Sequence, residues 1–194
     1  MEIGATKAVQ DRLKTTKIEE SKGASLVFCW DTHLTKIKGR NVLFIVNASN
    51  RYTLAMTDIE PRNWNYYTMY IRSVIHGVMQ EMGYSEDQIG QYFKMSGDTT
   101  VTKTHGRKSV GGINRMVMDA QYFGKKLEKE AKYQWELSKY LNRDICQPEG
   151  FDAYGYPNEL FKLDMERLGI ATKRKPAKVI DFAQYIENNR GTNH

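Results

Sequence analysis

The apolar run at residues 42–46, Val-Leu-Phe-Ile-Val, most strongly limits what this chain can fold into. It contains only β-branched, aromatic and leucine side chains, which favour a strand. A Gly-Arg-Asn turn signal precedes it at 39–41, and Asn-Ala-Ser-Asn follows it at 47–50. Because no polar residue interrupts the run, we expect this strand to be covered on both faces.

Two further strands are predicted beside this run, at residues 26–30 and 52–59. Short turns connect the three segments, so they predict an antiparallel meander. We also expect a turn at Asp31 and Thr32, where polar residues interrupt the apolar pattern. Residues 2–5 predict a short strand, and the threonine-rich residues 98–105 predict a strand at the edge of the sheet.

Helical spacing of apolar residues predicts most of the remaining elements. The expected helices are residues 7–14, 63–82, 86–96, 109–141, 158–168 and 179–189. Ser85 and Gln88 form the pattern of a capping box at the start of the third helix. The opposite charges at 125–132 are typical of a solvated helix surface. The fold class is therefore α+β: a small antiparallel sheet packed by helices, with a C-terminal helical extension.

The length of 194 residues suits one domain with an extension. We expect an α+β core domain at residues 1–120 and a helical extension at 121–194. The basic stretch at 172–178, Thr-Lys-Arg-Lys-Pro-Ala-Lys, is interpreted as a linker, with nucleic-acid binding as the alternative.

The two cysteines, Cys29 and Cys146, form no CxxC pair. This spacing argues against a structural zinc site, so we expect no metal and no cofactor. Unpatterned cysteines fit a reducing compartment. No apolar segment reaches the length of a signal peptide core or a membrane span. We therefore expect a cytoplasmic protein without a membrane partner.

The formal net charge of +6 favours an anionic partner. Basic proteins attract polyanions such as nucleic acid through their long-range field. The oligomeric state does not follow from the sequence.

The strongest candidate for anion binding is the basic segment that joins the strand at 98–105 to the following helix. Its predicted ligands are Lys103, Thr104, His105, Arg107, Lys108 and Ser109. The N-terminus of a helix offers free N–H groups to an anion, and Gly111 and Gly112 allow a ligand to approach closely. The segment lacks the Gly-Lys-Ser/Thr ending of a P-loop, and an exposed basic turn is the alternative.

A second candidate is Arg51, between the predicted strands at 42–46 and 52–59. A guanidinium at this place could bind phosphate or carboxylate with two parallel hydrogen bonds. Alternatively, Arg51 pairs with Asp58 or Glu60. Asn47 and Asn50 are polar candidates beside it, and both also suit the structure of a turn.

His33 is the third candidate, because Asp31 lies two residues before it. This pair could provide a general base or a metal ligand. The alternative is a turn beside the buried Trp30. No catalytic residue is assigned.

Three classes of function stay open. The first is a non-catalytic binding module for an anion, most plausibly nucleic acid. The second is an enzyme for a phosphorylated or carboxylated substrate, with His33 or His105 as acid or base and Arg51, Lys103 and Arg107 as anion ligands. The third is a protein-interaction partner of the phage accessory or toxin–antitoxin type. Twelve tyrosines, and Trp135 on a long helix, favour the third class.

Several short motifs, taken together, resemble a bacterial and phage family known as domain of unknown function 6933. They are Thr6-Lys7, then Trp30, Leu34, Ile37 and Arg40, then Val46-Asn47 and Asn50-Arg51-Tyr52, and finally Thr102-Lys103-Thr104 with Arg107. Gly39 stands where the family pattern suggests a second basic residue. The resemblance covers about residues 1–120. It implies a cytosolic α+β domain in a phage or mobile-element setting, and it implies no reaction.

Overall fold

The computed structural model describes residues 1–13 and 18–172, and it contains one five-stranded sheet in the order β4-β3-β2-β1-β5. The strands are β1 (Glu2–Ala5), β2 (Cys29–Ile37), β3 (Arg40–Asn47), β4 (Thr53–Thr57) and β5 (Thr100–Thr102). β2, β3 and β4 form the predicted antiparallel meander. Its first strand begins later than predicted, because residues 26–28 form a short 3-10 helix. The α+β fold class is therefore confirmed.

The turn predicted at Asp31 and Thr32 is wrong, because both residues lie inside β2. They pair with Val46 and Ile45 of β3, and both are fully buried. The hydroxyl of Thr32 donates to the carbonyl oxygen of Gly4 at 2.8 Å. Internal partners therefore allow polar side chains to occupy a position in the middle of a strand.

β1 lies inside the sheet, between β2 and β5, and runs parallel to both. Glu2 is in register with Cys29 on one side and with Thr100 on the other. β5 is at the edge, as the sequence predicts.

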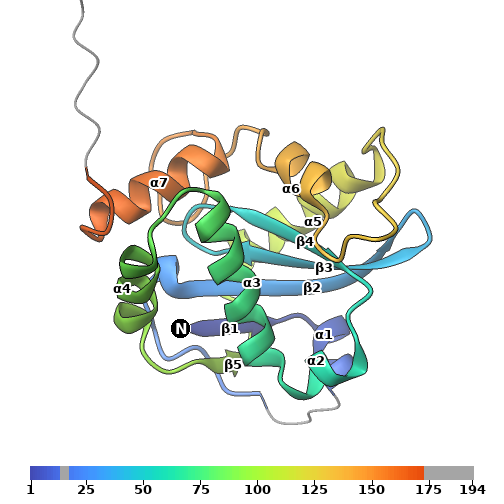
Figure 1. The fold of residues 1–194 in the computed structure, drawn as a ribbon, viewed down its shortest axis with the longest axis horizontal. Helices are drawn as coiled ribbons and strands as arrows, with labels where there is room; N and C mark the ends of the chain where they lie inside the picture. The colour runs from blue at the N-terminus through green and yellow to red at the C-terminus, as the bar shows by residue number, and fades with distance from the viewer. Residues whose placement is uncertain (14–17, 173–194) are drawn as a thin grey trace, which may run out of the picture.

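Helices pack on both faces of the sheet (Figure 1). They are α1 (Lys7–Leu13), η1 (Leu26–Phe28), α2 (Pro61–Asn65), α3 (Tyr67–Glu81), α4 (Glu86–Ser96), α5 (Arg107–Gln121), α6 (Trp135–Leu141) and α7 (Pro157–Arg167). In β3, Leu43 and Ile45 enter the core under α3, α4 and α7, whereas Phe44 enters the core under α5 and α6. The expected cover on both faces of this strand is confirmed.

α4 begins as its sequence predicts. Ser85 accepts a hydrogen bond from the Gln88 amide at 3.3 Å, and the Gln88 side chain accepts one from the Ser85 amide at 2.9 Å. The helix ends at Gly97, whose φ of 63° suits glycine.

The helix predicted at 63–82 is two helices, α2 and α3, which meet at Tyr66. Pro61 begins α2, because proline suits the first turn of a helix.

The helix predicted at 109–141 is also wrong, because α5 ends at Gln121 and α6 begins at Trp135. Residues 125–132 are not helical. Instead, Leu127 of this stretch is buried in the core under α5 and α6. Gln134 holds the stretch by donating to the carbonyl oxygens of Glu128 at 2.9 Å and Ala131 at 2.6 Å. These tertiary contacts override the helical pattern of charges.

The outer edge of β4 is covered by α6 and the segment before it. Asn142 accepts from the Thr53 amide and donates to the Thr53 carbonyl, both at 2.8 Å. The Ala55 amide donates to the Ser138 hydroxyl at 3.0 Å, and the Gln134 amide donates to the Ala55 carbonyl at 2.8 Å. Side chains and loop backbone thus replace a neighbouring strand.

α7 packs into the main core, where Phe161 contacts Trp30 and Tyr52 with ring centroids 6.2 and 5.1 Å apart. The domain boundary predicted at residue 120 falls within α5. Most of the predicted basic linker and the helix predicted at 179–189 lie outside the described residues.

None of the helices within residues 1–13 and 18–172 has both the length and the apolar character that a membrane span requires.

Candidate functional site

The basic segment before α5 turns two of its predicted anion ligands toward the protein interior. His105 lies between two carboxylates: its Nδ1 is 2.7 Å from Asp31 Oδ1, and its Nε2 is 3.0 Å from Glu2 Oε2. Only 3% of the His105 side chain is exposed. Ser109, in the first turn of α5, donates to Asp31. The anion at this helix N-terminus is therefore supplied by the chain itself.

Gly4 makes room for Asp31 on the neighbouring strand. The two residues are in register, and a Cβ atom on Gly4 would lie 1.8 Å from Asp31 Oδ1. The Asp31 carboxylate also accepts from the His105 amide, at 3.2 Å to each oxygen. The Asp31–His105 pair was not predicted from the sequence, since neither segment contains a signal that the two side chains lie together.

The charge of His105 follows from this enclosure. Burial alone lowers the pKa of His105, but its hydrogen bonds to Asp31 and Cys29 and their charges raise it to about 10. Burial also raises the pKa of Glu2, yet hydrogen bonds from Ser21 and His105 lower it below its ordinary value. Both ring nitrogens of His105 are thus engaged by carboxylates, which leaves neither free to serve as a general base.

The other residues of the basic segment point elsewhere. Lys103 is exposed and pairs with Glu20. Arg107 is exposed at the start of α5, and Thr104 is half-buried in the loop before it. Lys108 donates to the carbonyl oxygen of Pro148 at 3.2 Å.

His33 lies in β2 with its Nδ1 3.1 Å from the Thr6 hydroxyl. Burial lowers its pKa. The structure pairs Asp31 with His105, and the described contacts of His33 do not include Arg51 or Lys103.

Arg51 is held by a turn between β3 and β4. Its φ of 64° lies in the left-handed region, which is rare for residues other than glycine. Asn47 Oδ1 accepts from the amides of Ser49 at 3.0 Å and Asn50 at 3.3 Å. Asn50 accepts from the Tyr52 amide at 2.9 Å and donates to Asp164 at 2.9 Å. The two asparagines thus fix the turn that presents Arg51.

The side chain of Arg51 lies against α5, at Gly112. A Cβ atom on Gly112 would be 2.9 Å from Arg51 Nε, so only glycine leaves this space. Arg51 Nη2 donates to the Gly112 carbonyl at 3.3 Å. In the described part of the chain, the buried Nε has no hydrogen-bond partner. The predicted alternative partners are used elsewhere, since Asp58 pairs with Arg40 and Glu60 with Arg62 and Lys132.

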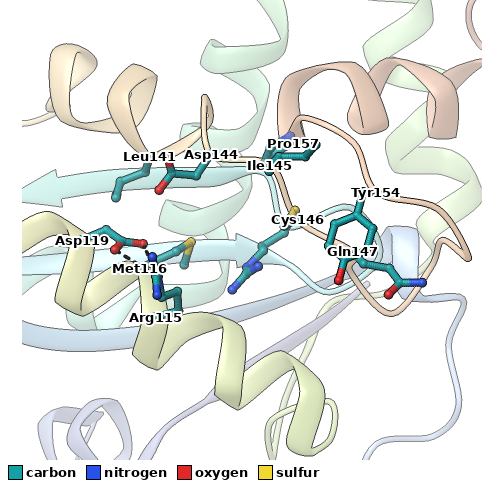
Figure 2. Close-up of a pocket in the computed structure, with 11 residues that line it drawn as sticks. Arg115, Met116, Asp119, Leu141, Asp144, Ile145, Cys146, Gln147, Tyr154 and Pro157 are labelled. Atoms are coloured by element: carbon teal, nitrogen blue, oxygen red, sulfur yellow. Dashed lines mark hydrogen bonds and ion pairs between the residues drawn. The ribbon is translucent and has the colours of Figure 1, made fainter.

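Arg51 lines two cavities. The larger has a volume of about 510 Å³ and lies between α5 and the segment that follows α6 (Figure 2). Arg115, Met116 and Asp119 enter it from α5, and Asp144, Cys146 and Tyr154 enter it from the other side. A volume of this size is typical of small-molecule sites.

The smaller cavity has a volume of about 120 Å³ and lies at the N-terminal turn of α5. Four residues predicted as candidates line it, from two distant segments: Asn47, Arg51, Lys108 and Ser109. Gln147 lines both cavities. Asn50, His33, Lys103, Thr104, His105 and Arg107 line neither.

Opposite charges balance in the larger cavity. Arg115 and Asp119 form an ion pair at 3.1 Å. Burial raises the pKa of the Cys146 thiol, although Arg51 acts in the opposite direction. Cys146 therefore remains a neutral neighbour of Arg51. The residues of the 142–156 loop were not predicted, because no local sequence signal distinguishes them from an ordinary loop.

Comparison with known proteins identifies the family only. No curated protein and no solved structure matches the chain. Residues 2–160 match the family described as Domain of unknown function (DUF6933), and this stretch includes every residue of both Arg51 cavities. The chain belongs to this family.

Proposed function

We propose that this chain is a non-catalytic, cytoplasmic binding protein for a small anionic molecule, with Arg51 as the main ligand. The supporting observation is the Arg51 guanidinium, whose buried Nε has no partner among the described residues. Leaving a buried charged donor unpaired is costly. An anion that accepts from Nε and a terminal nitrogen would satisfy it with two parallel hydrogen bonds.

The size and position of the smaller cavity favour a phosphate or carboxylate group. Its volume of about 120 Å³ is several times the ~30 Å³ share of one water in the liquid. Lys108 adds positive charge beside Arg51.

The rest of the ligand would occupy the larger cavity. Asp119 and Asp144 line that cavity, and Glu149 lines the smaller one. These carboxylates repel a polyanion and accept hydrogen bonds from hydroxyl or amine groups. We therefore propose a ligand with one anionic group and several donors, such as a phosphorylated or carboxylated polyol or amino compound.

The enzyme hypothesis has less support. His105 is enclosed by Asp31 and Glu2, and the described contacts of His33 are with Thr6 rather than Arg51. Among the described residues that line the two cavities there is no histidine, the most frequent general base of enzymes. Free, buried cysteines support the cytoplasmic proposal. A phage or mobile-element origin remains a proposal.

Binding can be measured by calorimetry and thermal shift with inorganic phosphate and a panel of phosphate monoesters and hydroxy or amino acids. We expect at least one member to bind the wild type and Arg51→Gln to weaken it by roughly 10-fold or more, as for a lost charged hydrogen bond. Gly112→Ala should have a similar effect, since it displaces the Arg51 side chain.

Arg107→Gln is the matched control, because it removes the same charge from an exposed position that lines neither cavity. Unchanged binding of every ligand in Arg51→Gln would contradict the proposal. A labelled oligonucleotide that binds the wild type, and is lost in Arg107→Gln but kept in Arg51→Gln, would support nucleic acid instead. Nucleic acid, the most plausible partner from the sequence alone, is therefore the second candidate, on the net charge of +6 and the exposed Arg107.

A further inference from the structure

Glu2, Cys29 and His105 meet on the face of the sheet that α5 covers. Glu2 and Cys29 are in register on neighbouring parallel strands, so their side chains leave the sheet on the same face. His105 comes from the loop between β5 and α5. One carboxylate oxygen, the Cys29 Sγ and a ring nitrogen of His105 all lie within 4.8 Å of one another.

The donor types suit zinc more than other common ions. Thiolate and imidazole are preferred by Zn²⁺, whereas Mg²⁺ and Ca²⁺ prefer oxygen ligands alone. Donors around a tetrahedral zinc lie roughly 3–4 Å apart, given metal–ligand bonds of roughly 2.0–2.3 Å. The 3.0 Å separation of Glu2 Oε2 and His105 Nε2 is close to this range.

Asp31 orients the histidine as metal sites usually require. Its Oδ1 lies 2.7 Å from His105 Nδ1, so Nδ1 keeps its proton, whereas Nε2 faces Glu2 and gives up its proton when it binds an ion. A carboxylate on the far nitrogen of a ligating histidine is a recurrent support in zinc sites. Ser21 and the Lys22 amide fix the Glu2 carboxylate at 2.6 and 2.8 Å.

The burial of these side chains favours a metal site over a catalytic triad. Cys29, His105 and Asp31 also have the order of a nucleophile, a base and its orienting acid. Cys29 and Asp31 have no exposed surface, however, and only 3% of the His105 side chain is exposed. A substrate carbonyl cannot reach the sulfur, whereas a single ion fits among buried donors.

We propose that Glu2, Cys29 and His105 bind one zinc ion, with Asp31 as the residue that positions His105. The absence of a CxxC pair argued against zinc in the sequence, but the three donors come from segments far apart in the chain. A site formed in this way ties together β1, β2 and the loop before α5. It is independent of the Arg51 cavities.

The test is the metal content of protein from zinc-supplemented cultures after dialysis against EDTA. Because the donors are buried, zinc should enter during folding and remain at about one ion per chain. Cys29→Ser should retain less than about one tenth of this amount. Cys146→Ser is the matched control and should retain all of it, since Cys146 lies in the Arg51 cavity. Asp31→Asn should weaken zinc binding by about 10- to 100-fold.

Cobalt offers a second readout that does not depend on whether Cys29→Ser folds. Wild-type protein refolded with Co²⁺ should show a thiolate-to-cobalt charge-transfer band, and Cys146→Ser should show the same band. Zinc retained equally by Cys29→Ser and wild type, or a wild type without retained zinc and without this band, would overturn the proposal. The cluster would then be an ion pair network alone.

Discussion

Two glycines decide where two charged side chains can lie. Gly4 leaves the space that the Asp31 carboxylate occupies, and Gly112 leaves the space for the Arg51 guanidinium. Neither glycine has a left-handed φ, so both act by the absence of a side chain. From the sequence, Gly112 was predicted to let a ligand approach closely. In the structure it admits another part of the same chain.

We expect Gly4→Ala to destabilise the protein by at least ~1–3 kcal/mol, the usual effect of an added methyl group in a packed interior. The new Cβ would meet both Asp31 Oδ1 and the Thr104 backbone, so a simple rotation cannot relieve it. The measurement is urea unfolding followed by circular dichroism.

Gly77→Ala provides the comparison for this experiment. Gly77 lies in α3 with no atom within 4 Å of its added Cβ, so alanine should stabilise the helix by up to ~1 kcal/mol. Equal unfolding midpoints for the two variants would show that the space beside Asp31 is not restrictive.

At the scale of elements, α6 covers the outer edge of β4, where a further strand would otherwise pair. An edge strand with open amides and carbonyls is prone to pair with other chains. Here the Asn142 side chain forms hydrogen bonds with both the amide and the carbonyl of Thr53. The Ser138 hydroxyl accepts a hydrogen bond from the Ala55 amide. A short helix can therefore close a sheet edge when its polar side chains face the strand.

Asn142→Ala should lower the free energy of unfolding by about 1–3 kcal/mol for each buried backbone group that loses its partner. Asn158→Ala, on the exposed side of α7, should change it by less than ~0.5 kcal/mol. Hydrogen exchange of the Thr53 amide gives an independent readout. Unchanged protection of this amide in Asn142→Ala would contradict the assigned role.

Elements with local signals could be predicted from the sequence, and those that depend on distant contacts could not. The meander and the capping box at Ser85 follow from neighbouring residues, and both are confirmed. The helix predicted through 122–134 failed because Gln134 and the buried Leu127 hold that segment by tertiary contacts.

The same distinction applies to the candidate residues. Arg51 and Lys108 could be named from the sequence as anion ligands, and the structure places them at one cavity. Asp31 looked like a turn residue, because its partner His105 is 74 residues away. Cys146 and Asp144 lie in a loop whose sequence gives no sign of a cavity.

At the scale of the whole molecule, the packing extends past the family match. The match ends at residue 160, and Phe161 directly after it is buried against Trp30 and Tyr52. The division into residues 1–120 and 121–194 stays a prediction. The position of α7 in the main core leads us instead to expect a single folding unit.

Phe161→Ala should destabilise the entire protein by about 3–5 kcal/mol, as large-to-small changes in a core do. Thermal unfolding should remain one transition, with the signals of Trp30 and Trp135 lost together. Leu163→Ala is the control, since Leu163 is 43% exposed on the same helix and should cost less than ~1 kcal/mol. Two separate transitions would favour the division near residue 120.

The interior place of β1 also sets an order of events during biosynthesis. β1 leaves the ribosome first, yet β5, which closes its outer side, follows about 100 residues later. At translation rates of ~5–20 residues per second, this delay is roughly 5 to 20 s. During this delay β1 has at most one neighbouring strand, β2, and His105 has not yet been made. The carboxylates of Glu2 and Asp31 therefore lack their hydrogen bonds to His105 until β5 and the loop after it have been synthesised.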